Sequence, residues 1–270
     1  MITPAEFADR HRPGAPLLLP NAWDAASARW LASRGHDAIG TTSLGVALAN
    51  GLHDGMGETA DETMRLAERL TGAGIGVSVD IESGFSDDPH EVGAYARRLG
   101  ELRVLGVNLE DSTAAGELVD LDLAAAKVAA IAAAAPGLFL NARTDAFWIG
   151  DGGSAPEREA VAVARATRYL QAGASGIFVP GPMPIDLIAR LAARIAAPLN
   201  VLPQADVAFD RLAAAGVARI STGSLLFRAA LGAMDDAVAR VLGTGTASGS
   251  VPTYDEAVEL AGPPPARESR

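Results

Sequence analysis

The 270-residue sequence contains no cysteine. It can therefore form no disulfide, and it offers no thiolate nucleophile, cysteine-ligated zinc site or iron–sulfur cluster. Lysine is almost as rare, because Lys127 is the only one among the 22 basic residues, and it lies inside an alanine-rich helical stretch. Chemistry that needs a lysine in the pocket, such as Schiff-base or pyridoxal phosphate catalysis, is disfavoured.

Positive charge and aromatic side chains are also scarce. The formal net charge is −11, aromatic residues make up 5% of the chain, and the isoelectric point is near 4.8. Nucleic acids and anionic membranes attract clusters of Lys and Arg, so we expect neither as a partner. The N-terminal stretch "MITPAEFADRHRPGAP" has no continuous apolar core, and Lys127 and Pro136 interrupt the most apolar helix. We therefore expect a cytoplasmic protein.

What the sequence does have is a regular alternation of short β-rich runs with longer amphipathic segments. The predicted strands span residues 16–20, 37–43, 76–82, 106–111, 138–145, 176–181, 198–203 and 218–222. Repeated βα units of this spacing favour an α/β fold built as a single (β/α)8 TIM barrel. An open doubly wound sheet is the alternative, but no glycine-rich phosphate-binding turn follows the first strand.

The barrel is expected to occupy residues 1–242 as one catalytic domain. The stretch from Gly243 onward, "GTGTASGSVPTYDEAVELAGPPPARESR", is rich in Gly, Ser and Pro around one short amphipathic run. For residues 243–270 we therefore expect a linker, a short helix and a disordered tail.

Polar residues gather where the predicted strands end. They are Asn21 and Asp24 after the first strand, Thr41, Thr42 and Ser43 after the second, Asp80 and Glu82 after the third, Glu110 and Asp111 after the fourth, Arg143 and Asp145 after the fifth, and Asn200 after the seventh. In a barrel these ends meet at one mouth, where catalytic groups lie. So many carboxylates at one place require a cation, and oxygen ligands suit Mg²⁺ or Mn²⁺.

A structural role is the alternative at each of these positions. An acid that closes a strand is also a common helix N-cap. Trp23, which follows the first strand, is a candidate for substrate contact, with packing at the rim as its alternative.

Four stretches, in this order, resemble the isocitrate lyase / phosphoenolpyruvate mutase superfamily. They are "PNAWDAASARWLASRGHDAIGTTSLGVALANGLHDG", "VSVDIESGFSDDP", "GVNLEDS" and "LFLNARTDAF", and the similarity extends over roughly residues 15–240. The resemblance implies an α/β barrel that binds Mg²⁺ and a small α-oxo-carboxylate and breaks or moves a C–C or P–C bond through a metal-bound enolate. It also implies a homo-oligomer, a dimer or a tetramer, in which subunits exchange the eighth helix.

Carried over residue by residue, the resemblance makes Asp80 the direct metal ligand, with Glu82 and Glu110 holding the metal through water. Thr42 and Ser43 would grip the substrate carboxylate, and Asn200 is a further candidate for substrate binding. Three residues would be catalytic: Asp54, Arg143 and Glu110, which would thus have both a metal-binding and a catalytic role. Asp54 would lie near metal and substrate, and Arg143 would stabilise the oxyanion.

The chain also departs from the family pattern. The segment after Glu110, "DSTAAGELVDLD", is short and lacks the Lys/Arg-Cys-Gly-His core of the lyases, which argues against isocitrate or methylisocitrate lyase activity. Gly40 replaces an aromatic residue and is expected to open the pocket. Pro180 and Gly181 stand where other members carry a glutamate or a histidine. Two readings stay open: an enzyme that acts on oxo acids of the oxaloacetate, phosphonopyruvate or substituted malate class, or a non-catalytic oxo-acid binder.

Overall fold

The computed structural model describes residues 1–149, 153–244 and 249–262. Its centre is a sheet of nine parallel strands in the order β1-β9-β8-β7-β6-β5-β4-β3-β2. The strands are β1 Leu17–Leu19, β2 Asn21–Ala22, β3 Ala38–Thr41, β4 Gly76–Asp80, β5 Gly106–Leu109, β6 Phe139–Arg143, β7 Gly176–Phe178, β8 Leu199–Val201 and β9 Arg219–Ser221.

The sheet closes on itself through its first strand. β1 pairs with β9, β2 pairs with β3, and only Pro20 separates β1 from β2. Proline has no N–H to give to a ladder, so it divides one continuous strand into two paired segments. When β1 and β2 are counted as one strand, the sheet is an eight-stranded barrel. This confirms the predicted (β/α)8 fold.

Helices surround the sheet. They are α1 Pro4–Asp9, α2 Ala25–Ser33, α3 Ser43–Ala49, α4 Ala60–Gly72, α5 Pro89–Glu101, α6 Leu121–Ala134, α7 Ala155–Gln171, α8 Ile185–Arg194, α9 Phe209–Ala214, α10 Leu225–Leu242 and α11 Tyr254–Val258, followed by the 3₁₀ turn η1 Glu259–Ala261. Their ends follow from local chemistry: Asp24 caps α2 through the Ser27 N–H, and Asp88 caps α5, which begins at Pro89.

Side-chain alternation along the strands separates an apolar layer from a polar interior. Val77 and Val79 of β4 belong to the main apolar cluster, which also contains residues of the surrounding helices. Ser78 and Asp80, the residues between and after them, face the other way. A smaller apolar cluster, Phe7, Leu19, Ala38, Leu105 and Phe139, includes a residue of α1 and closes the amino end of the barrel. Polar side chains therefore reach the opposite, carboxyl end.

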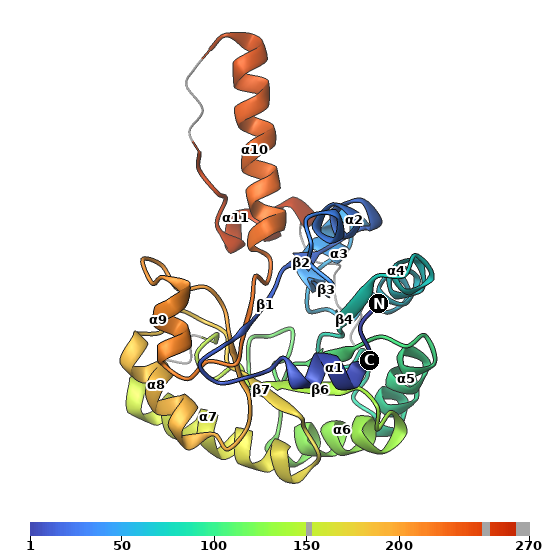
Figure 1. Ribbon diagram of the computed structural model, residues 1–270, viewed down its shortest axis with the longest axis vertical. Coiled ribbons are helices and arrows are strands. Elements are labelled where there is room, and N and C mark those ends of the chain that lie inside the picture. The colour runs from blue at the N-terminus through green and yellow to red at the C-terminus, as the bar shows by residue number, and fades with distance from the viewer. Residues whose placement is uncertain (150–152, 245–248, 263–270) are drawn as a thin grey trace.

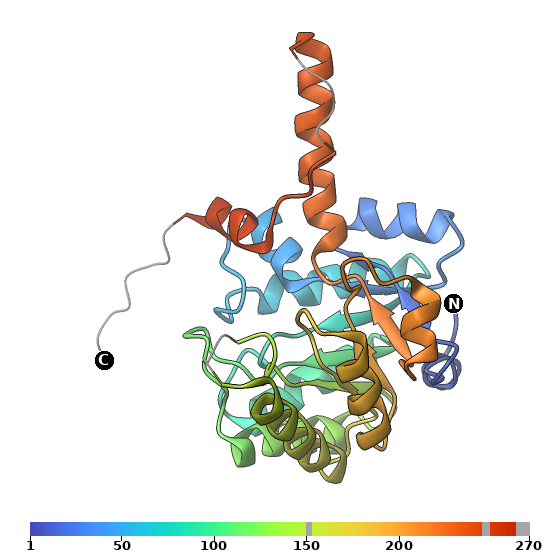
Figure 2. The same cartoon turned by 90° about the vertical axis from the view of Figure 1, so that its left-hand side faces the viewer.

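The C-terminal helices extend beyond the barrel. Helix α10 projects away from the body of the molecule, and α11 lies back at its base (Figures 1 and 2). This confirms the predicted helical extension, although the linker residues 245–248 and the predicted disordered tail 263–270 lie outside the described residues. The exchange of the eighth helix between subunits stays a prediction. Among the described helices, none has the length and apolar character needed to cross a membrane.

Candidate active site

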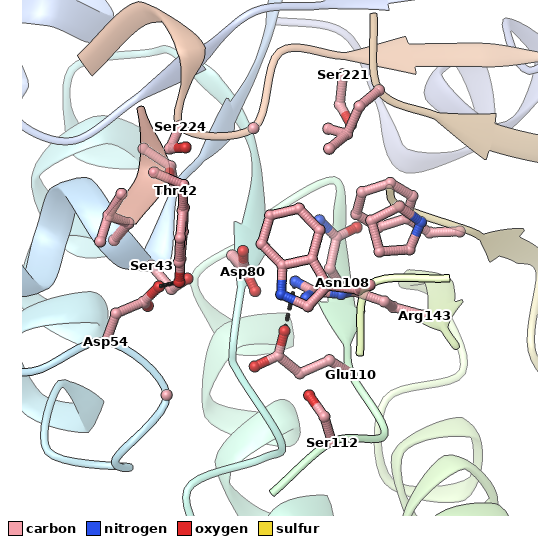
Figure 3. Close-up of a pocket in the computed structure, with 18 of the residues that line it drawn as sticks. Thr42, Ser43, Asp54, Asp80, Asn108, Glu110, Ser112, Arg143, Ser221 and Ser224 are labelled. Atoms are coloured by element: carbon pink, nitrogen blue, oxygen red, sulfur yellow. Dashed lines mark hydrogen bonds and ion pairs between the residues drawn. The ribbon is translucent and has the colours of Figure 1, made fainter. Parts of the chain in front are cut away.

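A cavity of about 330 Å³ opens at the carboxyl ends of the strands. Figure 3 shows polar side chains from several strands turned toward its centre. The sequence-predicted residues that line it are Asn21, Thr42, Ser43, Asp54, Asp80, Glu110 and Arg143; other lining residues are Asn108, Ser112, Trp148, Phe178, Pro180, Ser221, Ser224 and Tyr254. The structure thus brings together seven residues that the sequence predicted at one mouth.

Asp80 is the last residue of β4, and its backbone N–H donates to Thr41 Oγ1 at 2.8 Å. The pKa of its carboxyl is raised to about 6, because burial, with a smaller contribution from the nearby Asp54, raises it by more than Arg143 lowers it. Asp54 and Asp80 share this part of the cavity, and their negative charges repel each other. A nearby positive charge would therefore stabilise the ionised form of Asp80.

Arg143 lies between acids at the end of β6. It forms an ion pair with Glu110, and its Nε donates to Asp145 Oδ1 at 2.6 Å. The side chain is only 14% exposed, and its guanidinium also lies 5.6 Å from the Trp148 ring centroid. Burial raises the pKa of Glu110 well above its usual value despite the opposing effect of Arg143. The guanidinium is therefore a fixed cation in a site with excess negative charge.

The Thr42–Ser43 step joins β3 to α3. Thr42 is the N-cap residue, and its backbone N–H donates to Ala22 O. Asp54 lies in the loop that follows α3. Its Oδ2 accepts a hydrogen bond from the Tyr254 hydroxyl at 2.6 Å, while its Oδ1 is buried without a hydrogen-bond partner among the described residues.

Glu82 lies elsewhere than predicted. Its backbone φ is +48°, in the left-handed region, so the alternation of β4 stops after Asp80. Its carboxylate is buried and accepts hydrogen bonds from Gly57 N at 2.9 Å and Thr59 Oγ1 at 2.5 Å. Burial raises its pKa to about 7, against the lowering effect of these two donors. Glu82 therefore holds the loop after Asp54, and its side chain does not line the cavity.

Asn200 and Trp23, predicted to bind substrate, also do not line the cavity. Asn200 is buried in the barrel interior, where its amide is hydrogen-bonded to Ser221 Oγ at 3.2 Å. Trp23 packs edge-on against Phe227 with ring centroids 5.3 Å apart. These positions fit the packing alternative for Trp23 and place Asn200 below the layer of residues that reaches the mouth.

Gly40 does not open the pocket as expected. A Cβ at this position would lie 2.6 Å from Asn21 Nδ2 and 3.3 Å from Leu19. The Asn21 amide fills the space and donates to Thr41 O at 2.7 Å. The missing aromatic side chain is thus replaced by a polar group from the neighbouring strand.

Asn108 is a site residue that sequence reasoning missed. It lines the cavity from β5 and precedes Glu110 by two residues, so strand alternation was a usable signal. Its Oδ1 accepts from Arg219 Nη2 at 3.2 Å and from Asn141 Nδ2 at 3.0 Å. A guanidinium can only donate, so the Asn108 oxygen must face Arg219. The NH₂ group is then left as a donor for the cavity.

The segment after Glu110 forms a compact hairpin. Ser112 and Leu118 make an antiparallel bridge, and Thr113 N donates to Glu117 O at 2.8 Å. Its first residue, Asp111, points away from the mouth and accepts from Arg165 and Tyr169. The hairpin therefore adds Ser112 and Thr113 to the cavity wall but no basic residue.

The carboxylate oxygens on the wall are of the type that a hard divalent cation prefers. Among the described residues, no three His, Cys, Asp or Glu side chains are close enough to hold a metal between them. Mg²⁺ does not require such a cluster, because it usually keeps several waters and takes one or two carboxylates. Asp54, Asp80 and Glu110 line the same cavity, and the unpartnered Asp54 Oδ1 is an available acceptor.

Comparison with known proteins extends the similarity over nearly the whole barrel. A protein of Mycobacterium tuberculosis of uncharacterized function is 41% identical over 225 residues, which are 83% of this chain and 84% of the relative. A Burkholderia cenocepacia structure provisionally assigned as a phosphonomutase is 39% identical and superposes with a TM-score of 0.82, covering 89% of this chain and 99% of that one.

A third similarity concerns the fold alone. The structure of a phosphonopyruvate hydrolase in complex with oxalate and Mg²⁺ superposes with a TM-score of 0.77 at 22% identity, covering 97% of this chain and 95% of that one.

The family model of phosphoenolpyruvate phosphomutase matches residues 7–242. The chain therefore belongs to the phosphoenolpyruvate phosphomutase family, as its four motifs predicted.

Proposed function

We propose that this chain is an Mg²⁺-dependent enzyme that cleaves or transfers a C–C or P–C bond beside an α-oxo-carboxylate. The reaction would pass through an enolate, and Mn²⁺ would serve as an alternative cation. One observation carries the proposal: Asp54, Asp80, Glu110 and Arg143 line one cavity at the carboxyl end of a family barrel. Oxaloacetate, phosphonopyruvate and substituted malates are the substrates we would test.

The carboxylates are assigned by their positions on the cavity wall. Asp80 would be the direct ligand, since it ends β4 and its pKa is sensitive to nearby charge. Glu110 and Asp54 would hold the cation through water. When bound, a divalent cation withdraws electron density from the keto oxygen of the substrate and lowers the energy of the developing negative charge.

The substrate itself would be bound by hydrogen-bond donors on the cavity wall. Thr42 and Ser43 line the cavity at the start of α3 and would contact the substrate carboxylate. Arg143 would donate to the oxygen on which charge develops, because Glu110 and Asp145 hold its guanidinium in place before the reaction. The Asn108 NH₂ group would add a neutral donor.

The proton that quenches the enolate needs a separate source. The chain has no cysteine, and the hairpin 112–118 carries no basic residue or histidine. In decarboxylation we assign this role to water, whereas in P–C bond transfer the enolate oxygen takes the phosphoryl group and no proton is needed. Both reactions therefore suit this site better than retro-aldol cleavage.

The same hairpin favours a second candidate function. A barrel with its metal and carboxylate sites retained, but without the mobile acid of the lyases, could bind oxo acids and not turn them over. The enzyme would release a reaction product from an oxo acid, and the binder would not.

A panel of oxo acids separates them. We expect the purified protein to release pyruvate or a related product from at least one substrate with Mg²⁺, and to lose this activity in excess EDTA. Arg143→Lys serves as a matched variant, because lysine keeps the charge and loses the planar fork. A protein that Mg²⁺ and oxalate stabilise thermally, with no turnover of any substrate, would be the binder.

A further inference from the structure

The C-terminal helix α11 contributes a side chain to the cavity. Tyr254, its first residue, lines the same cavity as Asp80 and Arg143, although the sequence separates it from Asp54 by 200 residues. Figures 1 and 2 show α11 beside the base of α10 and not along that helix. The extension therefore returns to the mouth of its own barrel.

Tyr254 connects two groups of the proposed site. Its hydroxyl donates to Asp54 Oδ2 at 2.6 Å, at the edge of the cavity where Figure 3 labels Asp54. Its ring packs edge-on against Trp148 with centroids 5.2 Å apart, and Trp148 in turn lies against the Arg143 guanidinium. One aromatic pair thus spans the cavity from the carboxylate side to the guanidinium side.

Specific contacts hold the return segment in place. Arg228 Nη1 donates to Pro252 O at 2.5 Å. Gly232 of α10 allows Ser250 O to approach so closely that any Cβ there would clash with it. Thr253 and Glu256 form a capping box at the start of α11. The position of Tyr254 is therefore fixed by contacts on both sides of it.

Asp54 depends on this hydroxyl. Its Oδ1 has no partner among the described residues, so the contact with Tyr254 is what orients the carboxylate. A carboxylate that must act at a set distance from a substrate gains from a donor that fixes its rotamer. The neighbouring Trp148–Tyr254 pair also lines the cavity.

We propose that Tyr254 is a positioning residue of the site, which orients Asp54 and closes the cavity over small oxo acids from the C-terminal extension. The proposal rests on the function proposed above. It predicts that α11 becomes better protected when a small oxo-acid mimic is bound, and that the hydroxyl of Tyr254 is needed for this protection.

The test compares Tyr254→Phe with Tyr95→Phe in the full chain. Tyr95 is a matched control because its hydroxyl donates to Ala60 O at 2.7 Å and does not line the cavity. With oxalate as the probe and Mg²⁺ present, calorimetry should show binding weakened about tenfold or more by Tyr254→Phe, since a hydrogen bond to a charged group is lost. Tyr95→Phe should leave the affinity unchanged.

Hydrogen exchange supplies the second readout. In the free protein, Tyr254→Phe should speed exchange of the α11 amides, and Tyr95→Phe should not. In the wild type, Mg²⁺ and oxalate should slow that exchange, and this effect should be reduced in Tyr254→Phe. Thermal denaturation of both variants checks that each one is folded.

The outcomes separate this inference from the proposed function. Wild-type affinity in Tyr254→Phe together with unchanged α11 exchange would overturn the inference and leave the proposed function intact. If the wild type itself did not bind oxalate with Mg²⁺, the proposed function would fail. The exchange of α11 in the free variants would then still decide whether Tyr254 holds this helix on the barrel. Arg228→Met, which removes the bond to Pro252 O and the bond from Arg228 Nε to Ser224 Oγ at the cavity wall, should reproduce the faster exchange.

Discussion

Arg143 is the residue whose removal should most strongly disturb the charge balance of the site. Its side chain is 14% exposed and pairs with Glu110 at 10% and Asp145 at 0%. Removing one partner of a buried ion pair leaves an uncompensated charge, which costs about 3–5 kcal/mol. Arg143→Met should therefore lower the free energy of unfolding by about 3–5 kcal/mol at pH 8.

The loss should depend on pH with a definite sign. Burial raises the pKa of Glu110 and Asp145, and Arg143 lowers both. Without the guanidinium, the native state of the variant binds more protons than native wild type at pH values above the ordinary carboxyl range. Because these extra protons are bound in the native state of the variant, its free energy of unfolding falls relative to wild type as the pH rises. The difference between the two proteins should therefore widen from pH 5.5 to pH 8.

Urea denaturation followed by circular dichroism measures this difference, with Arg190→Met as the control. Arg190 also pairs with two carboxylates, Glu159 and Asp186, but its side chain is 51% exposed. Exposed ion pairs contribute little to stability because solvent screens them, so the control should lose little stability. Equal losses in the two variants at pH 8, or a gap that narrows as pH rises, would show that Arg143 does not compensate buried carboxylates.

Three further predictions concern other parts of the molecule. Glu82→Gln should reduce Mg²⁺-dependent oxalate binding less than about tenfold, because its carboxylate contacts the loop at 57–59; abolished binding in calorimetry would restore Glu82 as a metal ligand. His11 has its pKa lowered to about 3 by burial and by Arg219, so acid destabilises the native state once pH falls below the unfolded pKa of about 6.5. Relative to His11→Phe, the wild type should lose about 2 kcal/mol between pH 7.5 and pH 5 in urea titrations, and parallel pH curves would contradict this. The expected homo-oligomer should appear as a dimer or tetramer in sedimentation velocity; Val238→Glu on α10, where Val238 is 57% exposed, should shift it toward monomer, and a wild-type monomer would exclude it.

The sequence was sufficient for the barrel and for much of its mouth, because both follow from local periodicity. Alternation places Asp80 and Arg143 on the interior face, and parallel strands bring their carboxyl ends together. The same rule failed at Glu82, where a left-handed φ follows the last paired residue of β4. The alternation rule predicts side-chain direction only within a strand, and β4 ends at Asp80.

Contacts between distant segments were beyond the reach of pattern reasoning. Nothing near Tyr254 in the sequence indicates that it meets Asp54, since the return of α11 depends on how α10 leaves the barrel. Gly40 shows the same limit, because the space expected there is filled by Asn21 from another strand. Depth within the barrel was equally hidden: Asn200 faces inward yet lies below the cavity.

The most direct test is calorimetric titration of oxalate into wild type and Asp80→Ala, each with and without Mg²⁺. Oxalate is planar and resembles the enolate of an α-oxo acid, in which the carboxylate lies beside the enolate oxygen. If the cavity holds a divalent cation and an oxo acid together, wild type should bind oxalate only with Mg²⁺, and Asp80→Ala should not bind it under either condition. Equal oxalate affinity in the two proteins, or binding that is independent of Mg²⁺, would contradict the proposed site.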